Sequence, residues 1–337
     1  MNREHNILIT GGTGFLGAYL IKELSKKFKN IYVLSRQHNP EKFKEYQNVK
    51  VVIGDVTNLE VMALEGEEKK NILDSIDVVV HAAALYNLSA KYAECFLQNV
   101  AGTQNVLHLV NQMKNLKAFY YISTIAVGNQ DTFFLDENSL PPRNNFNDAY
   151  SETKYLAEQL VRENLNERFA TRIIRPGIIV GDSVTGEMPK IDGPYFFIEA
   201  FKKYSHILKF APIAPLSFNP RAKLPIIPVD HCARFIALLL ERDELKNKSK
   251  TYHLVSSELP TLAEFLGDLN QKFKVRTHYI PVKQNNLHNS LLKLLGIPEE
   301  VLPFMFSKLS YDKTSTLEDL PEISESTYGA FKHILFK

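Results

Sequence analysis

Cysteine, net charge and long hydrophobic runs are all scarce in this sequence. The two cysteines, Cys95 and Cys232, cannot build a disulfide framework, and the N-terminus shows no export signal, so we expect reduced thiols in a cytoplasmic protein. The 40 basic and 38 acidic residues leave a net charge of only +2. That balance gives no electrostatic case for nucleic acid or an anionic membrane, although a local basic groove stays open.

The missing patterns exclude further classes of protein. The most apolar later stretch, 235–240, lies between Arg234 and Glu241 and falls far short of the ~20 residues of a membrane span. The two cysteines and ten scattered histidines show no metal-site spacing, so we expect no metal. No internal repeat, low-complexity segment or unstructured linker is visible. The composition, 45% hydrophobic and 23% charged, is that of a soluble globular protein.

Short apolar runs alternate with helical patterns up to about Gly181. The strand candidates are Ile7–Ile9, Ile31–Leu34, Val49–Ile53, Val78–Val80, Phe119–Ile122 and Arg172–Ile174, and the amphipathic stretches between them include Leu16–Lys27, Asn99–Met113 and Tyr150–Asn164. Strands that are apolar on both faces, alternating with helices, indicate a parallel sheet covered on both sides. The sequence therefore predicts an α/β fold with a doubly wound, Rossmann-type sheet.

The alternation of apolar runs and helical patterns ends after Gly181. Residues 182–228 are rich in proline, glycine and aromatics and predict a long irregular segment, which is usually functional. A helix is expected at Val229–Leu240, a strand at Tyr252–Val255, and another helix after Pro260 and Thr261. We expect a cofactor-binding domain from 1–181 plus 225–257, and a smaller, mixed substrate-binding region from 182–224 and 258–337 packed on it.

The glycine-rich stretch "ITGGTGFLG" follows the first strand candidate and opens a helix. Gly12, Gly14 and Gly17 fit G-x-G-x-x-G, and Gly11, Gly14 and Gly17 fit G-x-x-G-x-x-G equally well. Glycines there allow a tight turn, a close approach of backbone to pyrophosphate, and tight contact between helix and strand. Because a helix N-terminus offers unpaired N–H groups to an anion, the loop predicts a bound dinucleotide. The expected contacts are Gly11, Gly12, Thr13, Gly14, Phe15, Leu16 and Gly17.

The second and third strands bear on the choice of dinucleotide. An NAD site usually has an acid about 20 residues after the loop, but here the second strand ends in Ser35 and Arg36. Arg36 is a planar, permanently charged partner for a 2′-phosphate, so NADP(H) is expected rather than NAD(H). Asp55 and Val56, in "GDV", follow the third strand and are expected beside the adenine, although Asp55 could instead cap a helix.

A second pattern, "AYSETKYLAEQL", points to chemistry. Tyr150 and Lys154 are four residues apart in a helical stretch and share one face. An ammonium beside a tyrosine stabilises the phenolate and lowers the pKa of the hydroxyl, and Lys154 can also bind the nicotinamide ribose. Ser123 and Thr124 place hydroxyls at the carboxyl end of the fifth strand, where ligands of such sheets bind.

In these motifs the sequence resembles the extended short-chain dehydrogenases/reductases. "TGGTGFLG", "GDV", "HAAA", "NVAGTQNV", "ISTIAVG", "YSETK" and "RPG" occur in the family's order over roughly residues 5–260. The resemblance implies that Tyr150 exchanges the proton, Lys154 tunes it, and Thr124 rather than Ser123 orients the carbonyl. It also implies that Asn99 supports the active-site helix, unless it is only a helix cap. Ala82, Ala83 and Ala84 of "HAAA" would leave room for the cofactor.

A narrower resemblance concerns substrate class. "RPGIIVGDSVTGEMP" and "IPVDHCARFI" look like the thioester-reductase and fatty-acyl reductase branch, which uses NADPH to reduce an acyl thioester to an aldehyde. It implies backbone contacts of Pro176 and Gly177 near the nicotinamide, whereas Arg175 is interpreted as part of a structural ion pair. The chain has no room for a fused carrier module, so the acyl group would arrive on CoA or a separate carrier protein. Either a monomer or a homodimer is compatible.

Two other functions remain open. The chain could be a reductase, dehydrogenase or epimerase for a small hydroxy or keto compound or a nucleotide sugar, with Lys202, Lys203 and Arg221 as the candidates for a diphosphate site. It could also be a non-catalytic NADP-binding sensor or scaffold, which would not need Thr124, Tyr150 and Lys154 together. The aromatic stretches Pro194–Tyr204 and Lys209–Phe218 could line an acyl pocket or serve ordinary core contacts.

Overall fold

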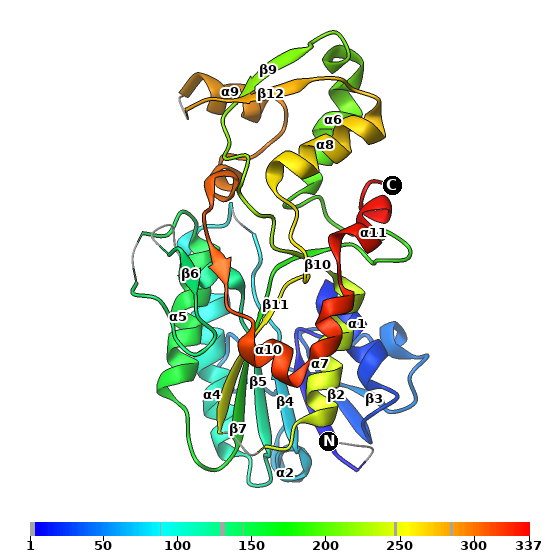
Figure 1. The fold of residues 1–337 in the computed structure, drawn as a ribbon. Helices are drawn as coiled ribbons and strands as arrows, with labels where there is room; N and C mark the ends of the chain where they lie inside the picture. The colour runs from blue at the N-terminus through cyan, green and yellow to red at the C-terminus, as the bar shows by residue number, and fades with distance from the viewer. Residues whose placement is uncertain (1–3, 88, 129–131, 144, 246–247, 284–285) are drawn as a thin grey trace.

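The computed structural model describes residues 4–87, 89–128, 132–143, 145–245, 248–283 and 286–337 (Figure 1). Its centre is a parallel sheet of seven strands in the order β11-β7-β5-β4-β1-β2-β3. The strands are β1 (Asn6–Thr10), β2 (Asn30–Ser35), β3 (Val49–Ile53), β4 (Val78–His81), β5 (Ala118–Ile122), β7 (Ala170–Pro176) and β11 (Ser249–Leu254). The α/β fold with a doubly wound parallel sheet is confirmed.

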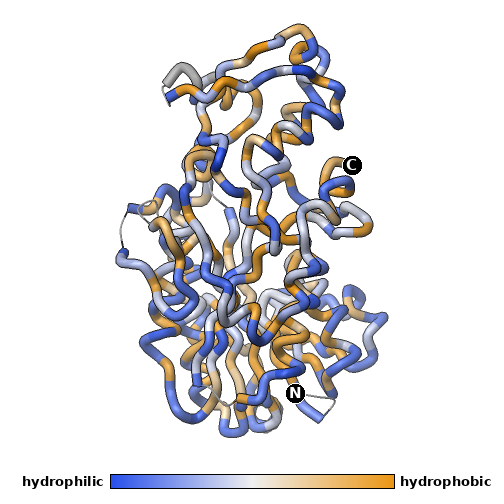
Figure 2. The backbone as a smooth tube through the Cα atoms, in the orientation of Figure 1, coloured by the Kyte–Doolittle hydropathy of each residue, from blue (hydrophilic) through white to orange (hydrophobic). Residues whose placement is uncertain are grey.

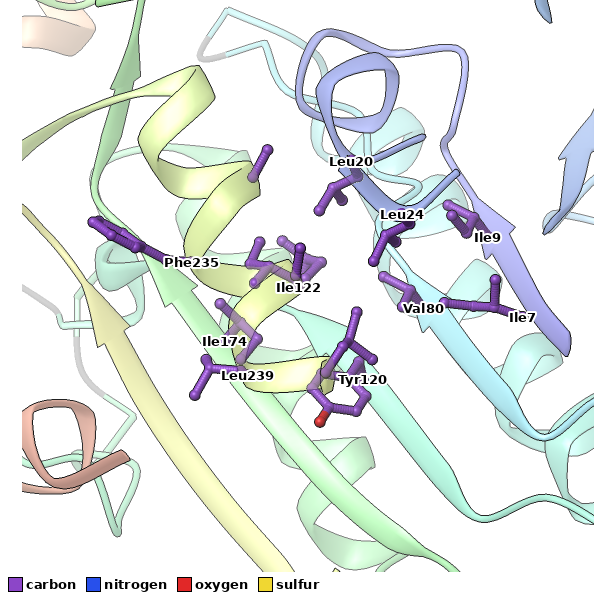
Figure 3. Packing of buried hydrophobic residues seen from close by; sticks show 14 of the residues in the cluster. Ile7, Ile9, Leu20, Leu24, Val80, Tyr120, Ile122, Ile174, Phe235 and Leu239 are labelled. Atoms are coloured by element: carbon purple, nitrogen blue, oxygen red, sulfur yellow. The ribbon is translucent and has the colours of Figure 1, made fainter. Parts of the chain in front are cut away.

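Successive strand residues serve opposite faces of this sheet. Ile7 and Ile9 belong to one core cluster, whereas Leu8, between them, belongs to the other. The same partition holds for Val80 against Val79. Figure 3 shows the first cluster, in which the strands meet two helices through Leu20, Leu24, Phe235 and Leu239. Both faces are apolar because helices cover both, as the continuous apolar runs predicted.

The helices divide between the two faces. Helices α1 (Phe15–Leu24) and α7 (Val229–Arg242) cover the face of Ile7, and α4 (Gly102–Gln112) and α5 (Ala149–Glu163) contribute to the core on the other. Shorter elements complete this half: η1 (Pro40–Phe43), α2 (Gly66–Ser75), α3 (Tyr92–Cys95), the π-helix η2 (Phe96–Ala101), η3 (Ile125–Val127) and β6 (Phe134–Leu135). From β1 the chain continues to β2 and β3 on one side, and from β4 to β5 and β7 on the other, so the strand order reverses between β1 and β4. The carboxyl ends of these two strands therefore flank the crevice where such sheets bind ligands.

The expectation of an irregular segment over 182–228 is wrong in part. It contains helix α6 (Tyr195–Leu208) and strands β9 (Ile213–Leu216) and β10 (Ile226–Pro228), while β8 (Ile178–Val180) precedes it. Pro194 and Pro228 stand at the ends of α6 and β10 and Pro215 lies on the half-exposed strand β9, where they cost few backbone hydrogen bonds, whereas Pro189 and Pro220 lie in irregular segments. Aromatic side chains such as Phe197 and Phe201 build a second apolar core with Phe265 instead of lining a loop.

The second core, built by α6, β9 and α8 (Leu262–Phe273), belongs to a C-terminal lobe, and the rest of the chain completes this lobe and returns to the sheet (Figure 1). The elements after α8 are β12 (His278–Pro281), α9 (Asn286–Leu294), η4 (Glu299–Phe306), β13 (Ser310–Tyr311), α10 (Thr314–Asp319), η5 (Pro321–Glu325) and α11 (Tyr328–Leu335). Helix α8 begins at Thr261 with a reciprocal capping box to Glu264, so the helix start expected near Pro260 is confirmed. None of the helices within the described ranges is long and apolar enough to cross a membrane.

A buried ion pair joins helix α5 to the sheet. Glu158 of α5 and Arg175 of β7 are both fully buried, and two nitrogens of the guanidinium contact the carboxylate at 2.6 and 3.0 Å. Arg162 and the hydroxyl of Ser123 also donate to Glu158, at 2.8 and 2.6 Å. Burial alone would raise the pKa of Glu158, but Arg175, Arg162 and Ser123 lower it to about 2. The interpretation of Arg175 as part of a structural ion pair is confirmed.

We expect the substitution Glu158→Gln to destabilise the fold by about 3–5 kcal/mol, because it leaves the Arg175 guanidinium buried without a counter-charge. The free energy of unfolding from urea titrations measures the effect. Glu152→Gln on the same helix is the matched control: Glu152 pairs with Arg143 at the surface, and its loss should cost no more than about 1 kcal/mol. Equal losses for the two variants would contradict the role given to the buried pair.

Candidate active site

The glycine loop connects β1 to α1 at the carboxyl edge of the sheet. Gly11 has φ of +75°, a left-handed conformation that favours glycine. A Cβ on Gly17 would overlap the carbonyl oxygen of Gly11, so a side chain there would force helix and strand apart. A Cβ on Gly11 would meet the backbone of Ala82 and Ala83 after β4. Glycine is therefore required where the two strands that flank the crevice come closest.

The start of α1 fits a phosphate group. Gly14 is the N-cap residue, is extended, and offers no side chain to the first helical N–H groups. A Cβ on Gly14 would lie only 3.2 Å from the oxygen of Gly11 and would fill the concave side of the loop. Exposed N–H groups at a positive helix end bind anions, so these residues fit the pyrophosphate of a dinucleotide.

The residues assigned to the adenosine end lie along the edges of β2 and β3. Arg36 is exposed just beyond β2. Asp55 accepts hydrogen bonds at 2.9 Å from both the N–H and the hydroxyl of Thr57, so one carboxylate oxygen closes a turn instead of capping a helix. Val56 is buried, and its carbonyl accepts a bond from Asn105. Their contacts with adenine stay a prediction.

Sequence reasoning missed Lys42, which belongs to the short helix η1. Its Nζ donates to the carbonyl oxygen of Thr13 at 2.6 Å, so an ammonium lies against the glycine loop. Nothing in the spacing of "QHNPEKF" marks this contact, because it joins segments 29 residues apart.

Helix α5 carries Tyr150 and Lys154 into the crevice. The helix begins at Asp148, whose carboxylate accepts a bond from the backbone N–H of Ser151 at 2.7 Å. Thr124 follows β5, and its hydroxyl hydrogen-bonds Tyr150. Four residues of helix separate Tyr150 from Lys154, so both face the strand end, as their spacing predicts.

Burial dominates the electrostatics of this pair. It lowers the pKa of Lys154 from 10.5 to about 7, against the opposing charge of Glu158. The Lys154 ammonium donates to the carbonyl of Ile122 at 2.7 Å and lies 4.3 Å from the centre of the Tyr121 ring. Burial also raises the pKa of Tyr150, although the bond with Thr124 opposes the shift. The prediction that Lys154 lowers this pKa is therefore not borne out, because burial raises it instead.

The two hydroxyls after β5 differ in their surroundings. Ser123 is buried and its Oγ donates to Glu158, whereas Thr124 lines the cavity beside Tyr150 and accepts a bond from the N–H of Ala126 at 3.1 Å. This placement favours Thr124 over Ser123 as the hydroxyl that meets a substrate.

Asn99 lies in the π-helix η2, a local irregularity of the kind often found at functional sites. Its side chain accepts from the N–H of Leu85 at 2.7 Å and donates to the hydroxyl of Thr153 at 3.0 Å. Asn99 therefore links the loop after β4 to helix α5 instead of capping a helix.

These elements surround a cavity of about 780 Å³. The predicted residues that line it are Gly11, Gly14, Phe15, Leu16, Gly17, Ala82, Ala84, Thr124, Tyr150, Lys154, Pro176 and Gly177. Gly12, Thr13, Arg36, Asp55, Val56, Ala83 and Asn99 are not among the lining residues. The cavity thus joins the inner half of the expected cofactor site to the catalytic set, and the adenosine residues lie outside it.

Tyr86 is a further lining residue that sequence reasoning missed. Its ring contacts Tyr150 edge to face, with centroids 4.7 Å apart. Burial and then the charge of Asp192 raise the pKa of Tyr86, and Lys190 donates to its carbonyl at 3.4 Å. The loop after β4 and the segment before α6 therefore meet over Tyr150, a contact between distant parts of the sequence that no motif marks.

Comparison with known proteins gives a family for this arrangement. The model of the male sterility protein family, which comprises NAD-binding domains, matches residues 9–236. A 3-beta-hydroxysteroid dehydrogenase of Mycolicibacterium neoaurum is 32% identical over 185 residues, covering 52% of this chain and 48% of that protein. Fatty acyl-CoA reductase wat of Drosophila melanogaster is 25% identical over 304 residues, covering 74% of this chain and 56% of that protein. The chain thus spans about half the length of these curated relatives.

A solved structure shares the fold over nearly the whole chain. The terminal R domain from the myxalamid PKS-NRPS biosynthetic pathway superimposes with a TM-score of 0.77 at 24% identity, covering 99% of this chain and 90% of that one. The matched residues 9–236 contain both the glycine loop and the Thr-Tyr-Lys cluster, which line the same cavity. The chain belongs to the male sterility protein family and so to the extended short-chain dehydrogenases/reductases, a family of NAD(P)-dependent oxidoreductases, and it is thioester-reductase-like, with a fatty acyl-CoA reductase among its relatives.

Proposed function

We propose that this protein is an NADPH-dependent reductase that acts on the carbonyl of an acyl thioester or aldehyde. The observation that carries the proposal is the meeting of Thr124, Tyr150 and Lys154 with the glycine loop in one largely apolar cavity. The far wall of this cavity consists of side chains from the second core, among them Phe197, Leu262 and Met305. An apolar wall facing the catalytic hydroxyls suits an acyl chain.

The cations predicted for the diphosphate of a nucleotide sugar do not line the cavity, although Lys190 and Lys308 do. A diphosphate would need a cluster of cations, yet Lys202, Lys203 and Arg221 are exposed and are not lining residues. Lys202 is paired with Glu199. The stretch Pro194–Tyr204 supplies Pro194 and Phe197 to the wall, whereas no residue of Lys209–Phe218 lines the cavity. The hydroxysteroid dehydrogenase among the relatives keeps a dehydrogenase for a small hydroxy compound as the second candidate.

In the proposed mechanism NADPH supplies the hydride. Thr124 and Tyr150 hydrogen-bond the carbonyl oxygen and stabilise the negative charge that develops as the hydride arrives. Tyr150 then gives its proton to that oxygen. Lys154 holds the cofactor ribose. As an ammonium it also stabilises the negative phenolate that remains after the proton transfer. With a thioester, the hemithioacetal formed releases a thiol and leaves an aldehyde; with an aldehyde, the product is an alcohol.

The shift of the pKa of Tyr150 suits a reductase. Because burial raises this pKa, the phenol stays protonated at neutral pH and is a proton donor. A hydroxyl in that state suits protonation of an oxyanion better than removal of a proton from an alcohol. A CoA ester or a carrier-bound thioester is compatible with the proposal, as are a monomer and a homodimer.

The preference for NADPH is part of the proposal. Arg36 follows β2 where an NAD site has an acid, and Lys42 lies against the same loop through Thr13. Two cations on one side of the glycine loop favour the doubly charged 2′-phosphate over a ribose hydroxyl.

The proposal is tested by NADPH consumption with acyl-CoA esters and aldehydes as substrates, and the alternative by NADP⁺ reduction with small hydroxy compounds such as hydroxysteroids. Turnover of a thioester or aldehyde is expected, and Tyr150→Phe should reduce kcat by about 10²–10⁴-fold because the proton donor is lost. Thr124→Ala should reduce it by about 10²-fold through loss of one oxyanion donor.

Two controls separate chemistry from folding. Thr124→Ser keeps the hydroxyl and should retain activity, whereas Ser123→Ala should retain kcat but lose stability, because Ser123 contacts Glu158. Reduction of NADP⁺ by a small hydroxy compound, with no NADPH consumption on thioesters or aldehydes, would support the alternative function. Tight cofactor binding with no turnover of any substrate class would support a sensor or scaffold.

The pH profile tests the role of Lys154. Its pKa of about 7 means that the ammonium is present below this pH and is lost above it. With saturating NADPH, kcat should be level below about pH 7 and then fall roughly tenfold per pH unit. Lys154→Arg, which stays charged, should remove this fall even if its kcat is low. A wild-type profile that is level from pH 6 to 9 would contradict the role of a charged Lys154.

Cofactor selectivity tests the two cations. Arg36→Ala and Lys42→Ala should each weaken NADPH binding by roughly 10–100-fold, the effect of one charge-assisted hydrogen bond, and leave NADH binding unchanged. Fluorescence titration of both cofactors measures this, with Lys44→Ala, an exposed neighbour paired with Glu41, as the control. Equal losses for both cofactors would assign Arg36 and Lys42 to folding, and tighter binding of NADH by wild type would overturn the preference.

A further inference from the structure

The C-terminal lobe concentrates positive charge that the whole-chain balance conceals. Residues 200–229 and 269–298 together contain ten lysines and arginines and no aspartate or glutamate, in a chain whose net charge is only +2. The two segments meet in space, because β9 and β12 pair in parallel from His278 opposite Ile213 to Pro281 opposite Leu216. This pair lies at the end of the molecule farthest from the parallel sheet, at the top of Figure 1.

Large apolar side chains are exposed at the same end. We call them the apolar tip: Ile207 and Phe210 at the end of α6, Ile213 of β9, Ile280 of β12 and Leu294 of α9. Phe210 is 87% exposed and Leu294 75%. Hydrophobic and hydrophilic segments meet along this end of the chain in Figure 2. Such a concentration of exposed apolar side chains is uncommon on a soluble protein unless the surface binds something.

The exposed side chains of the apolar tip do not belong to the second core, and those of β9 and β12 lie on the opposite face of these strands. Strands β9 and β12 turn their inner face to that core, where Tyr279 contacts the ring of Phe201 with centroids 6.3 Å apart. Ile213 and Ile280 occupy the alternate, outer positions. The buried Thr277 hydroxyl lies 2.8 Å from the carbonyl of Ala211 and 3.0 Å from that of Leu208, which fixes the end of α6 to the start of β12.

Exposed cations surround the apolar tip. Lys209 precedes Phe210, Arg276 and Lys283 flank β12, and Lys274 ends helix α8. Apolar side chains that enter the headgroup region, with lysine and arginine around them, are the pattern of a protein that lies on an anionic bilayer. A flat bilayer can contact only a part of the protein that protrudes, and the end formed by β9 and β12 protrudes (Figure 1).

We propose that the apolar tip and its surrounding cations dock the protein on an anionic lipid surface. The lack of acidic residues within both segments favours lipid over a protein partner, because the cations around the tip all gain from a uniformly negative surface, whereas Lys202 and Lys293 pair with Glu199 and Glu299 just outside the segments. Helix α6 has 14 residues and runs from Phe197 at the cavity wall to the tip, so docking would hold the cavity about 20 Å from the lipid. This docking is independent of the reductase activity proposed above.

Co-sedimentation of the full chain with vesicles tests the proposal. Binding is expected to a roughly 3:1 mixture of phosphatidylcholine and phosphatidylserine, and not to phosphatidylcholine alone, and it should weaken as salt rises. The double charge reversal Lys209→Glu with Arg276→Glu should reduce the partition coefficient by more than about tenfold, since each cation near the surface contributes about fivefold. Phe210→Ser with Ile213→Ser should reduce it as well, because the insertion of both side chains is lost.

Matched controls lie on the sheet domain. Lys26→Glu with Lys29→Glu changes the charge equally at exposed sites, and Leu59→Ser removes an apolar side chain that is 66% exposed; neither should alter vesicle binding. NADPH turnover of a soluble substrate should be the same for all these variants, so docking and activity are measured separately. The proposal is overturned if anionic vesicles do not bind, or if tip and control variants bind alike. It is also overturned if the tip variants lose binding only to an acidic carrier protein, since the tip would then be a protein interface.

Discussion

The ion pair between Glu158 and Arg175 is the contact through which the catalytic helix, the sheet and the C-terminal return of the chain are joined. Glu158 lies one turn beyond Lys154 on α5, so its anchoring to β7 fixes where Lys154 and Tyr150 stand above the strand ends. The same guanidinium donates to the carbonyls of Asp136 and Ser139 and contacts His253 of β11. A charge buried this deeply is tolerated only because all these partners are in place.

Desolvation is the second physical effect that shapes the site, because it sets the pKa values of Tyr150 and Lys154. The crevice removes Tyr150 and Lys154 from water, which raises one pKa and lowers the other, so both groups shift toward their neutral forms. Because the pKa of Tyr150 is raised and that of Lys154 is lowered, the phenol keeps its proton whether or not the lysine is charged. The hydroxyl of Thr124 and the edge of the Tyr86 ring then restrict where the phenol points.

The two lobes divide the chemistry between them. The sheet domain supplies the glycine loop and the hydroxyls of Thr124 and Tyr150, whereas the C-terminal lobe supplies an apolar cavity wall and a positively charged, apolar end. A near-zero net charge therefore hides an uneven distribution, because the acids are concentrated elsewhere in the chain. Charge counted along the whole sequence describes neither lobe correctly.

The sequence by itself determined the sheet, the glycine loop and the Thr124, Tyr150 and Lys154 cluster, because these depend on local periodicity and on short spacings within one strand or helix. It failed in part over 182–228, where prolines suggested irregularity but several stand at the ends of α6 and β10 or on β9. Only the tertiary structure brought Tyr86 to Tyr150, Lys42 to Thr13, and β9 to β12. Those contacts join residues far apart in the chain, and desolvation, which sets both catalytic pKa values, arises from the surrounding fold rather than from neighbours in sequence.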